Sequence, residues 1–152
     1  MPIPLPVAEH LATQQCASQW RGFMRALGDE FVSGLSAQDL RALMFRVGTR
    51  FGADHPLPAC GTLDELQQSM TAQWSRTDWG WVTLSQKAEY LQIEHSLSPL
   101  QAAFGPGHAQ WSAGFLEGVY QRWLEQMGSG QLRVRQVTET DAWGCVTFQL
   151  TR

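Results

Sequence analysis

One stretch decides the fold class of this 152-residue chain: Trp111-Ser-Ala-Gly-Phe-Leu-Glu-Gly-Val-Tyr-Gln-Arg-Trp-Leu-Glu-Gln-Met127. Its large apolar side chains recur at spacings of three and four residues, which is the period of a helix with one buried face. They are Trp111, Phe115, Leu116, Val119, Tyr120, Trp123, Leu124 and Met127. Gly128 and Gly130 follow directly and are typical of a helix end. The pattern therefore predicts an amphipathic helix that begins near His108.

Three more helices are predicted upstream from the same periodicity. The first ends near Gly34, and its apolar face consists of Trp20, Phe23, Met24, Leu27 and Phe31. The second begins with Ser36 as N-cap and ends at Gly52, and its apolar face consists of Leu40, Leu43, Met44, Val47 and Phe51. The third begins after a capping box of Thr62 and Glu65, and its apolar residues are Leu63, Leu66, Met70 and Trp74.

Aromatic and β-branched residues predict strands in the remaining segments. Residues 79–84 and 89–97 form one antiparallel pair, and residues 132–137 and 146–150 form a second. Residues 99–107 are predicted to be a loop, because turn-forming residues are frequent there. The order of three helices, two strands, one helix and two strands predicts an α+β fold in which a four-stranded antiparallel sheet packs against helices.

A chain of this length is predicted to form one folded domain preceded by a short arm. Pro2, Pro4 and Pro6 alternate with apolar residues, and proline fixes φ near −65°. We therefore expect residues 1–15 to form an extended, proline-rich arm and residues 16–152 to form a single α+β domain.

Composition excludes several classes of protein. Hydrophobic residues make up 43% of the chain and charged residues only 16%, with a net charge of −3, so the chain is not intrinsically disordered. Lys and Arg number 11 against 14 Asp and Glu and do not cluster, which argues against nucleic-acid binding. The low charged fraction and the seven tryptophans favour surfaces that are covered in an assembly or that meet a ligand.

The expected location is the cytoplasm. The first residues carry no Lys or Arg and are broken by prolines, unlike a secretory signal, and no apolar run reaches the ~18 residues of a membrane span. Three cysteines with no disulfide or metal-site spacing fit a reducing compartment; they are Cys16, Cys60 and Cys145.

No pattern of residues indicates catalysis, a metal or a cofactor. The sequence has no nucleophile elbow, phosphate loop or dinucleotide fingerprint. His55 and Cys60 lie near each other, but nothing completes a zinc ligand set. The adjacent carboxylates at residues 29–30 and 64–65 point about 100° apart on a helix and cannot cooperate as an acid–base pair. We therefore predict a protein that is not an enzyme.

Glycines and tryptophans are the candidate interface residues. Gly48 and Gly52, like Gly114 and Gly118, lie four residues apart on one helix, which predicts close approach of another backbone, from the same subunit or a neighbouring one. Four tryptophans fall in helical stripes and are predicted to be core residues: Trp20, Trp74, Trp111 and Trp123. The predicted subunit or partner interface therefore consists of Trp79 and Trp81, which are expected to share one face of a strand, with Gly114, Gly118 and Trp143.

Several short segments resemble the cellulose synthase operon protein D family, the small accessory subunits of bacterial cellulose secretion. The most specific is Leu-Glu-Gly-Val-Tyr-Gln-Arg-Trp at residues 116–123, and Trp-Gly-Trp-Val at residues 79–82 is second. Weaker matches are Arg46-Val-Gly48, the Pro-Leu-Pro-Ala-Cys60 turn and Thr62-Leu-Asp-Glu-Leu66. The resemblance extends from about Trp20 to the C-terminus.

The resemblance implies a non-catalytic accessory protein that forms a ring-like homo-octamer, built as a tetramer of dimers. It also implies a role in ordered export and crystalline assembly of β-1,4-glucan chains, together with the cellulose synthase complex and a proline-rich partner encoded in the same operon. Glucan passageways lined partly by N-terminal segments would place Ile3 and Leu5 along the glucan. A periplasmic location is the less favoured alternative.

Two other functions stay open at this point. The order of the predicted elements resembles that of vinyl-reductase-like and vesicle-tethering domains, which would make this protein a small-molecule sensor. A glucan hydrolase would need two carboxylates about 5 to 9.5 Å apart across a cleft.

Overall fold

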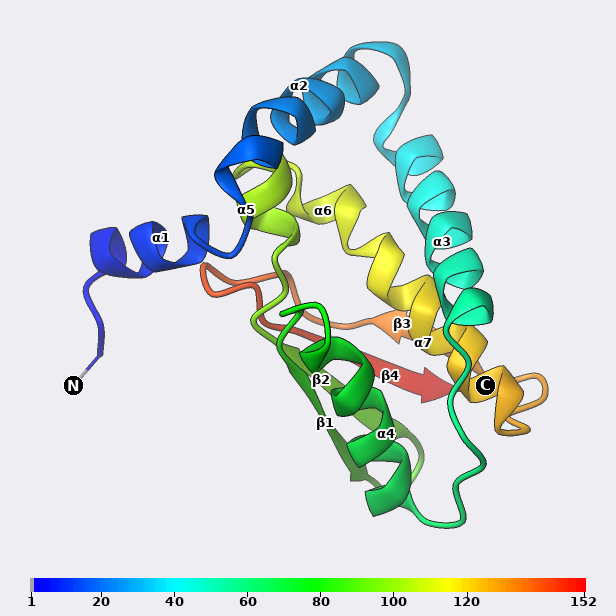
Figure 1. The fold of residues 1–152 in the computed structure, drawn as a ribbon. Helices are drawn as coiled ribbons and strands as arrows, with labels where there is room; N and C mark the ends of the chain where they lie inside the picture. The colour runs from blue at the N-terminus through cyan, green and yellow to red at the C-terminus, as the bar shows by residue number, and fades with distance from the viewer. Residues whose placement is uncertain (1) are drawn as a thin grey trace.

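In the computed structural model, which describes residues 2–152, helices pack against one face of a four-stranded antiparallel sheet (Figure 1). The strand order is β1-β2-β4-β3, and every neighbouring pair is antiparallel. The strands are β1 (Trp81–Gln86), β2 (Leu91–Ser96), β3 (Arg133–Gln136) and β4 (Val146–Thr151). The predicted α+β fold with two antiparallel strand pairs is therefore confirmed.

One face of the sheet is buried and the other is polar, as alternation along the strands dictates. The buried face carries Val82 and Leu84 from β1, Ile93 and His95 from β2, and Val134, Val146, Phe148 and Leu150 from β3 and β4. Apart from Trp81, the intervening residues are polar and lie towards solvent, as Glu94 does between Ile93 and His95. The core therefore lies between one sheet face and the helices.

The N-terminal segment differs from its prediction. Residues Leu5–Thr13 form a helix, α1, so the extended arm predicted for residues 1–15 is wrong over this range, and residue 1 lies outside the described residues. Proline is tolerated here because the first N–H groups of a helix have no partner within it. The carbonyl of Pro4 accepts hydrogen bonds from the N–H groups of Val7 and Ala8, which begins the helix.

Helices α2 (Ser18–Gly34), α3 (Ala37–Asp54) and α4 (Leu63–Ser75) confirm the three helices predicted upstream. The Ser36 hydroxyl accepts a hydrogen bond from Asp39 N–H, and the Thr62 hydroxyl accepts one from Glu65 N–H, so both predicted N-caps are present. The predicted end at Gly52 is wrong, because α3 continues for two more residues. Gly52 is instead buried against Arg122.

The segment before the decisive stretch is also more helical than predicted. Residues Leu100–Phe104 form α5, inside the predicted loop, and bury three of their side chains, Leu100, Ala102 and Phe104. The predicted helix after His108 is present as α6 (Ala109–Ser112) and α7 (Gly114–Gln126), which meet at Ala113. The α5 turn forms because Ser98 accepts a hydrogen bond from Leu100 N–H and the apolar side chains enter the core.

Candidate assembly surface

Helices α3 and α7 lie parallel in very close contact, and glycines make this possible. A Cβ atom at Gly118 would lie less than 3.0 Å from the carbonyl oxygen of Phe45, and one at Gly48 would lie less than 3.0 Å from the carbonyl oxygen of Phe115. Gly114 faces the Arg41 backbone in the same way. The neighbouring backbone therefore belongs to the same chain.

This contact corrects part of the predicted interface. Gly114 and Gly118 are buried within the subunit, so their assignment to a subunit or partner interface is wrong. The sequence pattern correctly indicated close helix packing, but the spacing of glycines is the same for packing within one subunit and between two.

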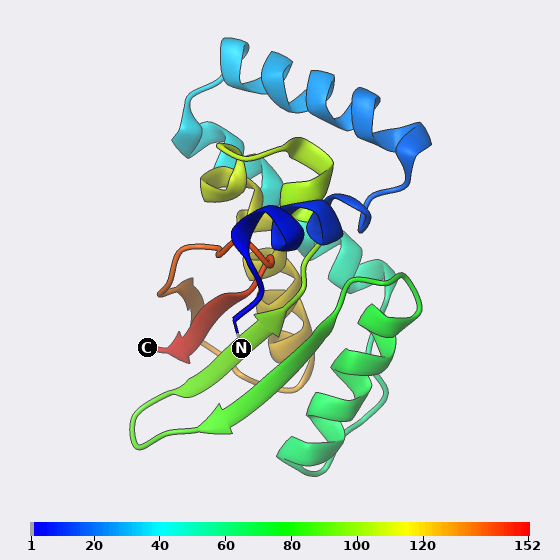
Figure 2. The same ribbon diagram turned by 90° about the vertical axis from the view of Figure 1, so that its left-hand side faces the viewer.

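Three of the four tryptophans predicted to lie in the core do so. Trp74, Trp111 and Trp123 are almost fully buried. Trp20 is not: 53% of its surface is exposed, so its prediction is wrong. The reason is the position of α2, which lies at the outside of the molecule, far from the sheet (Figure 2), and buries only Gly28 fully.

Trp79, Trp81 and Trp143 have three different environments. Trp79 lies before β1 and packs on Trp74, with 5.6 Å between ring centroids, so it belongs to the core. Gly80, with φ +83°, turns the chain, and Trp81 on β1 is 46% exposed; the two do not share one face. Trp143 is half-buried in the turn before β4. Of the Trp79–Trp81 pair, only Trp81 therefore presents a large surface to a partner.

An exposed aromatic pair lies on α2, and further exposed apolar side chains lie on and just before α1. Trp20 and Phe23 are one helical turn apart on α2, 53% and 58% exposed, and their rings meet edge to face at a centroid distance of 6.0 Å. The N-terminal segment adds four exposed residues: Ile3, Leu5, Val7 and Leu11. We call these six residues the N-terminal apolar surface. Paired exposed aromatics of this kind are typical of protein interfaces.

The N-terminal helix contacts α5. Ala8 on α1 is buried, and just after the helix the Gln15 side-chain amide donates a hydrogen bond of 3.1 Å to the carbonyl of Leu97. The outer side of α1 therefore stays free for contacts. The sequence patterns did not indicate that Val7, Leu11 and Phe23 are exposed apolar residues. Helix α1 could have been predicted from a proline in its first turn followed by good helix formers.

A polar groove of about 870 Å³ lies beside β3. Arg41 forms an ion pair of 2.8 Å with Glu117 in its wall, and Arg135 and Glu139 add one charge of each sign. The mixed charges favour no ionic ligand of either sign. The other polar groups of the groove are hydroxyls and amides, as on any polar surface. Among residues 2–152, no cluster of three or more His, Cys, Asp or Glu could hold a metal.

The most strongly perturbed titratable groups form a buried chain of hydrogen bonds. Trp74 N–H donates to the Tyr120 hydroxyl at 3.0 Å, and that hydroxyl lies 2.6 Å from His95 Nδ1. His95 Nε2 lies 2.8 Å from the Trp79 carbonyl, which can only accept, so Nε2 carries the proton and the Tyr120 hydroxyl donates to Nδ1.

Burial sets the ionisation of this chain of groups. It lowers the pKa of His95 to about 4, although the bond to the Trp79 carbonyl acts in the opposite direction, and it raises the pKa of Tyr120 well above its usual value. Both groups are neutral near pH 7. Because each polar atom has a partner within the core and no carboxylate or nucleophile joins them, this chain stabilises the fold.

Helices long and apolar enough to span a membrane do not occur in the part of the chain that the structure describes.

Comparison with known proteins identifies relatives by sequence. The family of cellulose synthase D subunits matches residues 6–150. A cellulose synthase operon protein D from Komagataeibacter xylinus is 32% identical over 104 residues, which cover 67% of each chain. The protein of the same name from Komagataeibacter sucrofermentans is 30% identical over the same share. Among solved structures, a vinyl-4-reductase family protein from Methanocaldococcus jannaschii aligns with a TM-score of 0.49 and 16% identity, over 99% of this chain and 82% of the other.

Proposed function

Because the chain belongs to the family of cellulose synthase D subunits, we propose that it is a non-catalytic accessory component of cellulose synthesis that works as an oligomeric scaffold. In this role it promotes ordered export and crystalline assembly of β-1,4-glucan chains. The observation that supports self-assembly is the exposed Trp20–Phe23 pair on α2. Aromatic side chains of this size gain most when a partner covers them, since each buries an area of about 150–250 Å².

The proposed assembly is the homo-octamer that the family resemblance implies, a closed ring built as a tetramer of dimers; closed symmetry of this kind is the common arrangement of homo-oligomers. Its proposed partners are the cellulose synthase complex and a proline-rich protein of the same operon. Ile3 and Leu5 are proposed to lie along the glucan, and their exposure, 50% and 58%, leaves them free to do so. Trp81 and Trp143 remain proposed contact residues.

The proposed location is the cytoplasm, beside the synthase. Cys16, Cys60 and Cys145 are free thiols in the described chain, and free thiols persist in a reducing compartment. Labelling of intact cells with a thiol reagent that does not cross the inner membrane tests this proposal. The cysteines should react only after lysis, and labelling without lysis would contradict a cytoplasmic location.

The first experiment is the molar mass in solution, measured by light scattering behind a sizing column. Eight copies of a 17.0 kDa chain give about 136 kDa. A mass near this value supports the scaffold. A stable monomer would contradict it and would favour the sensor domain as the alternative.

The cellular role is tested by deletion in the bacterium that makes the protein. Loss of the chain should lower the cellulose yield and disorder the fibres, and expression of the chain from a plasmid should restore both. Unchanged yield and fibre alignment would contradict a role in ordered export.

A further inference from the structure

The outer strands of the sheet are β1 and β3, and each has a helix beside it (Figure 1). On an ordinary edge strand, every second N–H and C=O group points outward without a partner and can pair with a strand from another chain. Here side chains of the adjacent helix occupy outward N–H groups on both edges.

The β1 edge is occupied from α4. Leu84 N–H donates to the side-chain oxygen of Gln67 at 2.8 Å, and Val82 N–H lies 3.3 Å from the Thr71 hydroxyl. The same hydroxyl lies 3.3 Å from the Val82 carbonyl oxygen. Gln67 and Thr71 are four residues apart, so they lie on one face of α4, towards the strand.

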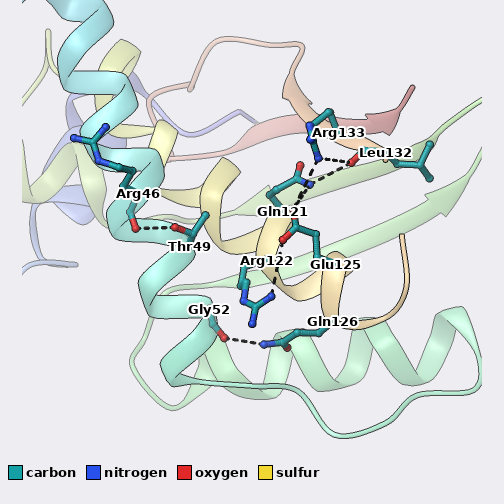
Figure 3. A network of polar contacts seen from close by, with 9 residues as sticks. All are labelled: Arg46, Thr49, Gly52, Gln121, Arg122, Glu125, Gln126, Leu132 and Arg133. Atoms are coloured by element: carbon teal, nitrogen blue, oxygen red, sulfur yellow. Dashed lines mark hydrogen bonds and ion pairs between the residues drawn. The ribbon is translucent and has the colours of Figure 1, made fainter. Parts of the chain in front are cut away.

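The β3 edge is occupied from α7 in the same manner. Val134 N–H donates to the side-chain oxygen of Gln121 at 2.8 Å, and Gln136 N–H donates to the Glu117 carboxylate at 2.9 Å. The Gln121 amide also donates to the Leu132 carbonyl at 3.2 Å, as Figure 3 shows. Glu117 and Gln121 are again four residues apart, and the ion pair with Arg41 fixes the carboxylate.

We propose that Gln67, Thr71, Glu117 and Gln121 close both edges of the sheet against strand addition, so that this chain associates through its helices. The inference that the chain associates through its helices rests on the proposed scaffold function. Two unrelated helices meet the two edges with the same spacing and bind the same kind of group. A single occurrence would be an ordinary satisfied backbone group, whereas both edges together remove the sheet as a template for a second copy.

The proposal predicts that this chain, although only 16% of its residues are charged, does not aggregate through its sheet edges. Charged side chains on edge strands commonly prevent such pairing. Here β3 carries the exposed Arg133 and Arg135, and on both edges the hydrogen bonds from the helices add to this protection, which leaves the N-terminal apolar surface to direct association.

The test uses the double variant Gln67→Leu with Thr71→Val, which removes both acceptors on α4. Its matched control is Gln68→Leu with Ala72→Val, which adds apolar groups at exposed positions of the same helix. Hydrogen exchange across residues 81–86, followed by mass spectrometry, should become at least 10-fold faster in the variant and stay unchanged in the control. A peptide with the β1 sequence, Trp-Val-Thr-Leu-Ser-Gln, should bind the variant and not the control.

The β3 edge provides an independent second test. Glu117→Gln keeps an acceptor oxygen for Gln136 N–H, whereas Glu117→Leu removes it. Only the leucine variant should form larger, β-rich species by light scattering and infrared spectroscopy. If the α4 double variant does not fold, Gln67→Leu alone frees one N–H group and is measured in the same way.

Variants with a native circular dichroism spectrum but unchanged exchange, no peptide binding and no larger species would overturn the proposal. This result is distinct from failure of the scaffold function. The molar mass of the unmodified chain tests the scaffold, and the difference between edge variants and their controls tests the closed edges.

Discussion

The carbonyl oxygen of Phe45 on α3 occupies the space that a side chain at Gly118 on α7 would need. The reciprocal relation holds for Gly48 and the Phe115 carbonyl. The backbones of these two parallel helices are thus in direct contact. Because the neighbouring atoms are backbone, rotation of a side chain cannot make room for a larger residue on α7 at this position.

Gly118→Ala should therefore destabilise the fold, although alanine favours a helix by about 0.5–1 kcal/mol over glycine. The added methyl group meets backbone, so the helices must separate, and we expect the free energy of unfolding to fall by about 2 kcal/mol or more. Urea unfolding followed by circular dichroism measures this change.

The matched control is Gly22→Ala on α2, where an added Cβ has nothing within 4 Å. This variant should be as stable as the unmodified chain or more stable by up to about 1 kcal/mol. Equal effects of the two substitutions would show that the α3–α7 contact is not as close as described.

Trp20→Ala with Phe23→Ala should reduce self-association and leave the fold intact. Both rings are more than half exposed, so their removal from a single chain opens no core cavity. The molar mass measured by light scattering should fall towards smaller species, while the midpoint of thermal unfolding at low protein concentration stays within a few degrees.

Gln19→Ala is the control for this variant, because Gln19 is an exposed polar residue of the same helix. Its mass distribution should match that of the unmodified chain. If the aromatic double variant also keeps the mass of the unmodified chain, the N-terminal apolar surface does not carry the assembly through α2.

The stability of the chain should depend on pH through His95. Its pKa is about 4 in the folded chain and 6.5 when unfolded. Above pH 6.5 the imidazole is neutral in both states. As the pH falls below 6.5 the unfolded chain binds the proton first, so the free energy of unfolding decreases until about pH 4, by up to about 3 kcal/mol.

Chemical unfolding at several pH values between 4 and 7 measures this dependence. His95→Gln removes the titrating group and keeps a donor and an acceptor, so its stability should change less over the same interval. The carboxylates are the same in both proteins, so the difference between the two pH profiles of the free energy of unfolding reports on His95. Identical pH profiles for the two would contradict a neutral, buried His95.

Tyr120→Phe should be strongly destabilising for its size. The hydroxyl accepts from Trp74 N–H and donates to His95 Nδ1, and its loss leaves the indole N–H and Nδ1 buried without a partner. We expect a loss of about 2 to 4 kcal/mol in the free energy of unfolding. Tyr90→Phe, which removes a hydroxyl from a half-buried tyrosine outside this chain of hydrogen bonds, should change it by less than about 1 kcal/mol.

Periodicity and capping in the sequence determined most of the fold. The helix through Trp123, the N-caps Ser36 and Thr62, and the two antiparallel strand pairs all follow from local patterns whose physical basis lies within a few residues. The burial of Trp74 and Trp123 followed in the same way, because an apolar stripe needs a surface to cover it.

Only the tertiary structure decided which apolar faces are covered. Trp20 and Trp111 occupy equivalent places in helical stripes, yet α2 lies outside the core and exposes Trp20, while Trp111 packs on Phe104. Likewise, glycine spacing predicts close approach without identifying the neighbour, and here it is α3 of the same chain. Local sequence sets the face that an element offers, whereas burial depends on groups far away in the chain, which is why the closed sheet edges at Gln67 and Gln121 became visible only in the folded molecule.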